Sequence, residues 1–468
     1  MIDPQYFSYK DPNARVVKKA DGYYRYIFTS YRPDYDHLIQ SGLYERLIGL
    51  GLMITHKEVE VDSPDPAIYK LLYPEQIGFL SYPYEWSYAQ WRKAILAFLK
   101  INELALEYGM ILKDATPFNF FITGGKAVLL DTSSFVFYRD GDPWLAYRQF
   151  CEEFLAPFAL MHYNGASWAR LYRSYLYGLP LSFVSKELPM KSRFNLTCLL
   201  HLHLHARFQN NPKQEKQTQK GRHTKEKLRT LLSMVQSTAD SWKSCFAYKP
   251  VWVDYYEKDI ESNEYLEDKK KTVDRWLAGA NPGTVIDLGA NTGMFSRIAA
   301  THARQVVAVE YDDSCVDKLE KAVTEEKINN LTALVGDLAE VSPSLGLLNR
   351  EYPSLFNRGR SELAMGLALI HHLCIGKNMP LAHIAEMMAL FSTGYAIVEF
   401  IPKEDPKVQF LLKDRADIFT GYTETNFVTC FEKWFEVAES HQCLSSKRKL
   451  YFFRKRNSYE IAPRTATA

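Results

Sequence analysis

One short stretch, TVIDLGANTGMFSR at residues 284–297, constrains the fold of this chain more than any other. A mostly apolar segment with strand character runs into a turn that contains two glycines, and helix-forming residues follow from Met294. Glycine has no Cβ, so the backbone can turn sharply here and a ligand can lie close against it. Backbone N–H groups at the start of the following helix would face that ligand. The stretch therefore predicts a strand–turn–helix binding loop, which dinucleotide enzymes also use.

Polar side chains stand near the ends of the apolar segments that follow. QVVAVE ends at Glu310, about 20 residues after the glycines, where a carboxylate can hold the two hydroxyls of a ribose. LTALVGD ends at Asp337, and ELAMGLALIHHL carries the pair His371 and His372 near its end. A fifth segment, GYAIVEF, comes after a helical stretch. We interpret these segments as successive strands.

In this order and spacing, the residues resemble the class I S-adenosylmethionine-dependent methyltransferases. The pattern Asp287-x-Gly289-x-x-x-Gly293 stands where nicotinamide enzymes have Gly-x-Gly-x-x-Gly, and acidic residues follow strands two and three. The resemblance covers about residues 250–456. It implies an α/β domain with a Rossmann-like, seven-stranded sheet and S-adenosylmethionine as the cofactor, and it leaves the acceptor open.

The same resemblance implies roles for individual residues. Four of them would form the loop near the methionine part of the cofactor: Asp287, Gly289, Asn291 and Gly293. Glu310 would bind the ribose hydroxyls. Asp337 would accept a hydrogen bond from the adenine amino group, and Leu338 would lie beside the ring. Taken singly, each residue could instead be a turn glycine or a solvated strand end.

His371 and His372 are the candidate catalytic bases. A hydroxyl nucleophile must lose a proton when it takes a methyl group, and histidine titrates near neutral pH. The alternative is that one histidine packs the loop or bonds the backbone. Glu399 and residues 403–405 are expected to line the same pocket. No Asn/Asp-Pro-Pro-Tyr/Phe sequence follows the fourth strand, which disfavours methylation of DNA adenine, and no carboxylate set indicates a metal.

A second informative stretch is LKDATPFNFFITGGKAVLLDTSSF at residues 112–135, in which Gly124-Gly125 predicts the turn of a hairpin. It resembles the catalytic loop of protein-kinase-like and aminoglycoside-phosphotransferase-like folds, which implies Asp114 as a base and Asn119 and Asp131 as magnesium ligands. Leu112 replaces the usual histidine, Asp-Thr-Ser replaces Asp-Phe-Gly, and no glycine-rich phosphate loop precedes the stretch. We therefore expect a degenerate kinase-like module that binds magnesium and ATP only if its site is active.

The rest of the N-terminal half indicates short strands and helices. The predicted elements are a hairpin turning at Asp21-Gly22, a helix over 35–51, a strand over 76–86 and a helix over 86–112 with Ser87 as its N-cap. His201 and His205, four residues apart, have the spacing of a shared metal site on a helix. No acidic or cysteine partner lies nearby in the sequence, so a structural role is favoured.

Composition limits the class of protein and its compartment. Lys and Arg total 57 and Asp and Glu total 55, and this balance argues against a general nucleic-acid binder. Seven cysteines without C-x-x-C spacing indicate free thiols in a reducing compartment. The N-terminus lacks the apolar core of a signal peptide, and no run of about 18 apolar residues occurs. We expect a cytoplasmic protein without an integral membrane contact.

Four parts of the chain are expected from these observations. They are a kinase-like α+β domain at 1–207, a basic linker and helix at 208–249, a class I methyltransferase domain at 250–456, and a disordered tail at 457–468. The boundary between the first two parts rests on residues 208–228, which are polar, basic and without apolar periodicity.

The order of segments along the whole chain carries a further resemblance. SYPYEWS, LKDATPFN, HLHLHAR, DLGANTG and VEFIPKEDPKVQ, in this order, resemble a bacterial family of host-specific nodulation proteins, the NoeA-like family. This implies a role in nodulation or in modifying a cell-surface or secreted glycan or metabolite. We therefore expect a methyltransferase acting on a hydroxyl-bearing small molecule or glycan. The alternatives are a bifunctional protein with an active N-terminal phosphotransferase site and an RNA methyltransferase.

Overall fold

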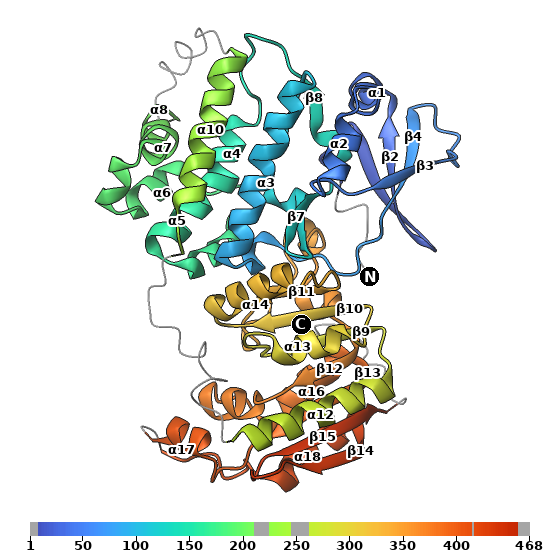
Figure 1. The fold of residues 1–468 in the computed structure, drawn as a ribbon, viewed down its shortest axis with the longest axis vertical. Helices are drawn as coiled ribbons and strands as arrows, with labels where there is room; N and C mark the ends of the chain where they lie inside the picture. Colours follow the sequence, from blue (N-terminus) through green and yellow to red (C-terminus); the bar gives the residue numbers. More distant parts are fainter. Residues whose placement is uncertain (1–7, 210–223, 245–261, 414–415, 457–468) are drawn as a thin grey trace. The chain divides into compact units, whose positions relative to one another are not determined.

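The computed structural model describes residues 8–209, 224–244, 262–413 and 416–456 (Figure 1). The chain divides into two compact units. Unit 1 contains residues 1–249 with the short segments 324–327 and 344–353, and unit 2 contains the rest. Most of the predicted linker and all of the predicted tail lie outside the described residues. In the ranges that are described, no helix is both long and apolar enough to cross a membrane.

Unit 1 begins with a four-stranded antiparallel sheet in the order β1-β2-β4-β3. Its strands are β1 (Ala14–Lys19), β2 (Gly22–Phe28), β3 (His56–Val59) and β4 (Ile68–Pro74). Lys19 pairs with Gly22, which confirms the predicted hairpin, but its turn is at Ala20-Asp21, one residue before the predicted Asp21-Gly22. The predicted helix over 35–51 is instead two helices, α1 (Arg32–Gln40) and α2 (Leu43–Gly49). Gly42 separates them, because its φ of +85° is left-handed and interrupts the helical backbone.

The long helix of unit 1 is α3 (Tyr88–Glu107), and Ser87 caps it by accepting a hydrogen bond from the Gln90 amide. The helix ends before the predicted limit of 112, because the chain turns at Gly109 with φ +75°. Residues Met110–Leu112 then form β5, which pairs with β8 (Phe135–Phe137).

The strand predicted over 76–86 is wrong, since this segment contains the short 3₁₀ turn η3 (Pro83–Glu85) in place of a strand. Its aromatic side chains are buried in the core of unit 1: Tyr82, Tyr84 and Trp86. The apolar pattern of the segment therefore reflects packing in the core and not pairing in a sheet.

The kinase-like stretch folds as a hairpin of β6 (Phe120–Thr123) and β7 (Lys126–Leu129), with Gly124 and Gly125 at its turn as predicted. The helices that follow in unit 1 include π-helical turns within longer helical runs. They are α4 (Tyr147–Phe150), η6 (Cys151–Leu155), α5 (Ala156–Asn164), η7 (Ala166–Arg173), α6 (Leu181–Glu187), η8 (Met190–Phe194), α7 (Leu196–Cys198), η9 (Leu199–Leu204), α8 (His205–Gln209) and α10 (Lys225–Ser241).

The histidines of η9 and α8 pack among other side chains of unit 1. The His201 ring is hydrogen bonded to Tyr147 Oη at 2.7 Å, and the His205 ring stacks on the same tyrosine. Among the described residues, no three His, Cys, Asp or Glu side chains are grouped to hold a metal ion.

Unit 2 is built on a seven-stranded sheet in the order β11-β10-β9-β12-β13-β15-β14 (Figure 1). The strands are β9 (Thr284–Leu288), β10 (Gln305–Glu310), β11 (Leu331–Val335), β12 (Ser361–Gly366), β13 (Ser392–Phe400), β14 (Phe435–Gln442) and β15 (Lys449–Lys455). Strands β9 to β13 are parallel, and β15 runs antiparallel between β13 and β14. The predicted Rossmann-like, seven-stranded sheet is thus confirmed.

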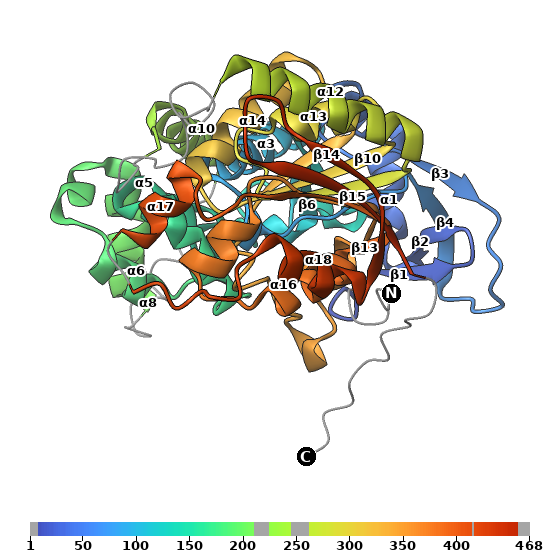
Figure 2. The same ribbon diagram turned by 90° about the horizontal axis from the view of Figure 1, so that it is seen from below.

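Helices cover both faces of this sheet (Figure 2). On one face lie α12 (Asn263–Ala280), α13 (Met294–Ala300) and α14 (Asp313–Glu325), and on the other lie α16 (Leu381–Phe391) and α18 (Glu424–Glu432). Shorter helices are α15 (Leu355–Arg358) and α17 (Pro406–Leu412). The five parallel strands end at one edge of the sheet, the edge at which ligands bind in open α/β sheets.

The sequence suggested that the histidine pair ends a strand, but the structure places the pair after the strand. Strand β12 ends at Gly366, and the chain turns at Ala368, whose φ is +51°. His371 and His372 begin the helical turn η11 (His372–Gly376) that follows. The apolar residues at 367–370 continue the strand pattern because they are mostly buried, not because they pair with a neighbouring strand.

Candidate functional site

The loop between β9 and α13 leaves the sheet beside strand β10. The amides of Gly289 and Ala290 both donate to the Val309 carbonyl, at 2.9 and 3.0 Å. Gly289 and Gly293 have φ values of +76° and +77°, which favour glycine. A Cβ at Gly293 would come within 2.2 Å of Leu319 Cδ1, part of a fully buried side chain on α14. The left-handed backbone therefore favours glycine at both positions, and the close packing of Leu319 also excludes a larger residue at position 293.

Glu310, the last residue of β10, accepts three backbone hydrogen bonds. The Asn291 amide donates to one carboxylate oxygen at 2.7 Å, and the Tyr311 and Asp312 amides donate to the other at 2.7 and 2.9 Å. Asn291 has a left-handed φ of +52°, which directs its amide to this carboxylate. Burial raises the pKa of Glu310 above its usual value, although the three amides act in the opposite direction. The predicted loop and the predicted ribose acid therefore meet.

Asp287 is 2% exposed and lies within β9. Its Oδ2 accepts a hydrogen bond from Ser296 Oγ of α13 at 2.6 Å. Burial raises the pKa of Asp287 to about 6; Ser296 and the Lys269 charge lower it, and the Glu310 charge raises it further. Among the side chains the structure describes, neither Asp287 nor Glu310 is hydrogen bonded to a cation. Two neighbouring carboxylates are thus buried without a bonded counter-charge.

Asp337 follows β11 and is bonded to a lysine from another loop. Lys377 Nζ donates to Asp337 Oδ2 at 3.2 Å and lies 5.3 Å from the centroid of the Tyr311 ring. The Ala339 amide donates to the other carboxylate oxygen at 2.9 Å, and the neighbouring Leu338 is 8% exposed. The sequence analysis missed Tyr311 and Lys377, because a tyrosine and a lysine in loops have no pattern that distinguishes them from solvated surface residues.

His371 and His372 lie with their ring centroids 4.0 Å apart. His371 is 1% exposed, and neither of its ring nitrogens has a hydrogen-bond partner among the described residues. Burial lowers the pKa of His371 well below its usual value, and the charges of His372, Arg448 and Lys269 act in the same direction. Burial lowers the pKa of His372 to about 4. Both imidazoles are therefore neutral near pH 7.

The loop that carries the histidines packs against the glycine loop. A Cβ added at Gly289 would lie 3.1 Å from Leu369 Cδ1, so the Leu369 side chain rests directly on the turn. The amides of His372 and Leu373 donate back to the Leu369 carbonyl, at 3.0 and 3.2 Å, and start the helical turn there. The loop that carries the predicted bases thus packs, through Leu369, on the predicted cofactor loop.

A buried polar network, formed by Tyr265, Lys269, Glu399, Asp405 and Arg448, belongs to the same unit. Lys269 Nζ donates to Glu399 Oε2 at 2.6 Å, and Tyr265 Oη donates to the other oxygen of that carboxylate. Arg448 binds Asp405 with both arms of its guanidinium, at 2.7 and 3.2 Å. All five side chains are at most 3% exposed. The sequence analysis missed Lys269, since it stands in EDKKKT, a charge run typical of a solvated helix face.

The residues predicted as a kinase-like site lie together in unit 1. Arg25 of β2 forms an ion pair with Asp131. The hydroxyls of Ser133 and Ser134 donate to the same carboxylate, at 2.6 and 2.5 Å. Burial lowers the pKa of Arg25 to about 10, so the guanidinium stays charged near pH 7. The carboxylate predicted to bind magnesium is therefore bonded to a cation of the chain itself.

Asp114, the predicted kinase-like base, is bonded by two amide side chains. Gln149 Nε2 donates to one carboxylate oxygen at 2.6 Å, and Asn119 Nδ2 donates to the other at 3.1 Å. Burial raises the pKa of Asp114 above its usual value. A phosphotransferase role for these residues stays a prediction.

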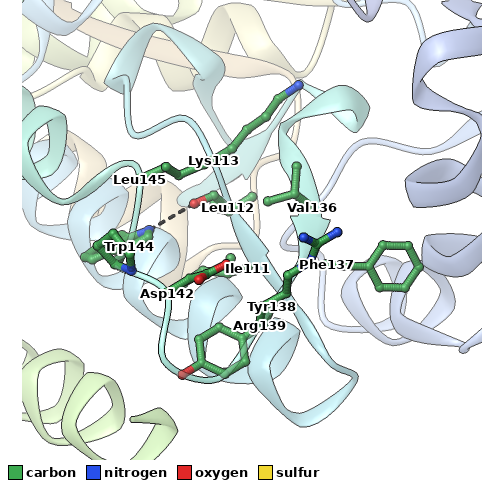
Figure 3. Close-up of a pocket in the computed structure, with 11 residues that line it drawn as sticks. Ile111, Leu112, Lys113, Val136, Phe137, Tyr138, Arg139, Asp142, Trp144 and Leu145 are labelled. Atoms are coloured by element: carbon green, nitrogen blue, oxygen red, sulfur yellow. Dashed lines mark hydrogen bonds between the residues drawn. The ribbon is translucent and has the colours of Figure 1, made fainter. Parts of the chain in front are cut away.

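A cleft of about 280 Å³ lies in unit 1 next to this stretch (Figure 3). Its walls come from β5, β8 and the loop that follows β8. Trp144 Nε1 donates to the Leu112 carbonyl at 2.9 Å and fixes one wall, and Lys113, Arg139 and Asp142 contribute charged groups. The cleft contains none of the residues predicted to bind the cofactor, all of which belong to unit 2.

The strand order, the glycine loop and the acid at the end of the second strand define unit 2 as a class I S-adenosylmethionine-dependent methyltransferase domain. The chain is 31% identical over 396 residues to the nodulation protein NoeA of Rhizobium meliloti (strain 1021), and the match covers 83% of each chain. The chain therefore belongs to the family of this nodulation protein. No protein-family model matches the chain.

Solved structures of methyltransferases resemble the chain more distantly. The N-methyltransferase NodS from Bradyrhizobium japonicum WM9 is 11% identical, with 42% of this chain and 99% of that chain covered and a TM-score of 0.31. The magnesium protoporphyrin IX methyltransferase ChlM from Synechocystis PCC 6803 is 18% identical, with 44% and 97% covered and a TM-score of 0.31. We base the assignment of the fold on the strand order and not on these similarities.

Proposed function

We propose that the protein transfers a methyl group from S-adenosylmethionine to a hydroxyl group of a small molecule or glycan in the cytoplasm. The observation that carries this proposal is the pair of buried carboxylates beside the glycine loop, Asp287 and Glu310, which are bonded to no cation of the described residues. S-adenosylmethionine carries a positive sulfonium and a positive ammonium group, so this site attracts it. The negative phosphates of a nicotinamide dinucleotide would be repelled. The name of the nodulation relative supports an acceptor connected with nodulation.

The proposed roles follow from the geometry of each group. The loop Asp287–Gly293 would hold the methionine part of the cofactor with its glycines and the Asn291 backbone. A carboxylate offers about four acceptor positions, so Glu310 keeps one for a ribose hydroxyl beside its three amide bonds. Asp337 would exchange its Lys377 bond for the adenine amino group, with Leu338 beside the ring.

His371 is the proposed acceptor of the hydroxyl proton. In methyl transfer the bond from sulfur to the methyl carbon breaks as the bond from the acceptor oxygen forms, and the hydroxyl proton must leave. A neutral imidazole can accept that proton, and the buried surroundings of His371 keep it neutral. We prefer His371 to His372 because both ring nitrogens of His371 lack a partner within the described chain.

Calorimetric titration of S-adenosylmethionine into the full chain tests the cofactor site. We expect micromolar binding by the wild type and at least tenfold weaker binding by Asp287→Ala and Glu310→Ala. The matched control is Glu432→Ala, which removes an exposed carboxylate of α18. It should bind the cofactor like the wild type.

Thermal unfolding of each variant separates loss of the site from loss of the fold. A variant that unfolds like the wild type and fails to bind supports the proposal. A wild type that binds no S-adenosylmethionine would overturn it, as would equal affinity in the wild type and Glu310→Ala.

A further inference from the structure

Glu399 is bonded by donors from two separate elements of unit 2. Lys269 Nζ and Tyr265 Oη reach it from α12, and the Ala368 amide donates to its Oε2 at 2.8 Å from the loop after β12. The Glu399 side chain is 0% exposed. Burial alone would raise its pKa, but the charges of Lys269 and Arg448 more than offset burial and lower the pKa. Glu399 is therefore a fixed, ionised acceptor for the Ala368 amide.

Ala368 has a backbone conformation that a residue with a Cβ avoids. Its φ is +51°, in the left-handed region, where a side chain with a Cβ strains the backbone. Such a conformation persists only where neighbouring groups hold it, and it recurs at functional sites. The hydrogen bond from the Ala368 amide to Glu399 is a contact that can hold this conformation.

His371 follows Ala368 by three residues, and neither of its ring nitrogens has a hydrogen-bond partner among the residues that the structure describes. A buried polar group without a hydrogen bond is destabilising, so the imidazole favours a bonding group that the described residues do not supply. Without a hydrogen bond to either ring nitrogen, the direction of the ring depends on the packing around it and on the backbone of the loop from 367 to 371. That backbone is the part that Glu399 holds.

We propose that Glu399 is a positioning residue whose bond to the Ala368 amide holds the loop that aims His371 at the acceptor hydroxyl. Lys269 and Tyr265, four residues apart on one face of α12, fix the carboxylate for this purpose. The part of this inference that concerns the acceptor rests on the proposed function. The part that concerns the loop is a property of unit 2 and can be tested without any acceptor.

Histidine side-chain NMR of the full chain, labelled at His Cε1, tests the inference. His371→Asn identifies the His371 signal among those of the 12 histidines. We expect Glu399→Gln to shift this signal, because a neutral amide holds the Ala368 amide and Lys269 less well than a carboxylate. The matched control is Glu432→Gln on α18, which should leave the signal in place.

A rescue variant distinguishes positioning from a general loss of stability. Glycine adopts a φ near +51° without strain, so Glu399→Gln combined with Ala368→Gly should return the His371 signal toward its wild-type position. An unmoved signal in Glu399→Gln would overturn the inference. So would a shift of the same size in the single and the double variant.

Two further measurements keep the outcomes separable. If Glu399→Gln does not fold, Tyr265→Phe removes one donor and leaves the Lys269 ion pair, and a smaller shift of the His371 signal is expected. Calorimetry with S-adenosylmethionine on the wild type tests the proposed function separately from the loop. Absence of cofactor binding by the wild type would defeat the proposed function, while the His371 shift and its rescue would still decide the role of Glu399 in the loop.

Discussion

Two largely buried aspartates, Asp131 in unit 1 and Asp287 in unit 2, are stabilised in different ways. Asp131 is bonded to the guanidinium of Arg25 and to two serine hydroxyls. Asp287 is bonded to the hydroxyl of Ser296 and lies near a second carboxylate, that of Glu310. A carboxylate that is already bonded to a cation and to hydroxyls of the chain has few free acceptor positions for a ligand. An acid buried without a bonded cation costs stability and attracts a cationic ligand, which is the usual conflict between stability and binding.

The largest expected effect is that of breaking the unit 1 ion pair. Arg25→Met should destabilise the chain by somewhat less than the ~3–5 kcal/mol typical of a broken buried pair, because the serine hydroxyls still bond Asp131. The free energy of unfolding, measured by chemical denaturation, checks this. Arg25→Met combined with Asp131→Asn should recover much of the loss. A single variant as stable as the wild type would show that the ion pair contributes nothing.

The corresponding change in unit 2 should have the opposite sign. The pKa of Asp287 is about 6 in the folded chain against a usual value of 3.8, so the folded state holds more protons between these two pH values. Stability contributed by the protonated group is therefore present below about pH 4 and is lost as pH rises to about 6. At ~1.36 kcal/mol per pKa unit, the ionised carboxylate costs about 3 kcal/mol at pH 7.

Asp287→Asn should therefore stabilise the chain by up to about 3 kcal/mol at pH 7 and by almost nothing at pH 4. The same variant should bind S-adenosylmethionine more weakly. Denaturation at the two pH values, with calorimetry at pH 7, measures both effects. A gain in stability of equal size at pH 4 and pH 7 would contradict this prediction. It would mean that the gain does not depend on whether the Asp287 carboxyl is ionised.

Two left-handed glycines extend the comparison of the two units. Gly42→Ala should cost ~1–2 kcal/mol for its φ of +85° alone, because no atom of the described residues lies within 4 Å of the added Cβ. Gly293→Ala should cost ~1–3 kcal/mol more, because its Cβ would displace Leu319. Denaturation of both variants measures the difference. Equal costs would mean that Leu319 moves aside freely and that packing does not select the glycine.

The parts of the structure that depend on neighbouring residues in the sequence could be predicted from it. The glycine turn between β9 and α13, the acid at the end of β10 and the hairpin at Gly124-Gly125 each follow from a local pattern. The position of His371 does not follow from a local pattern, because the end of β12 depends on where its pairing with other strands stops. The apolar residues beyond Gly366 have the same pattern whether they pair or only pack.

Contacts between residues distant in the sequence explain most of what was missed. Arg25 and Asp131 are 106 residues apart, and Lys269 and Glu399 are 130 apart. Lys269 stands in a charge run and Arg25 stands in the strand segment YYRYIF, and in neither case does local periodicity indicate that the side chain is buried against an acid. Such pairs become visible only when the fold brings their elements together.

The smallest expected effect is that of magnesium and ATP on unit 1, where we predict no change in the wild type. Magnesium needs oxygen ligands in near-octahedral geometry, and the Asp131 oxygens are already bonded to Arg25 and two serines. Thermal unfolding with and without millimolar Mg²⁺ and ATP should therefore give the same melting temperature. A melting temperature of the wild type that rises with Mg²⁺, and that does not rise in Asp131→Ala, would contradict this prediction. It would show that a metal can displace Arg25 from Asp131, so that unit 1 also has an acid available to a ligand. A rise seen only in Arg25→Met would instead show that the guanidinium occupies the position a metal could take.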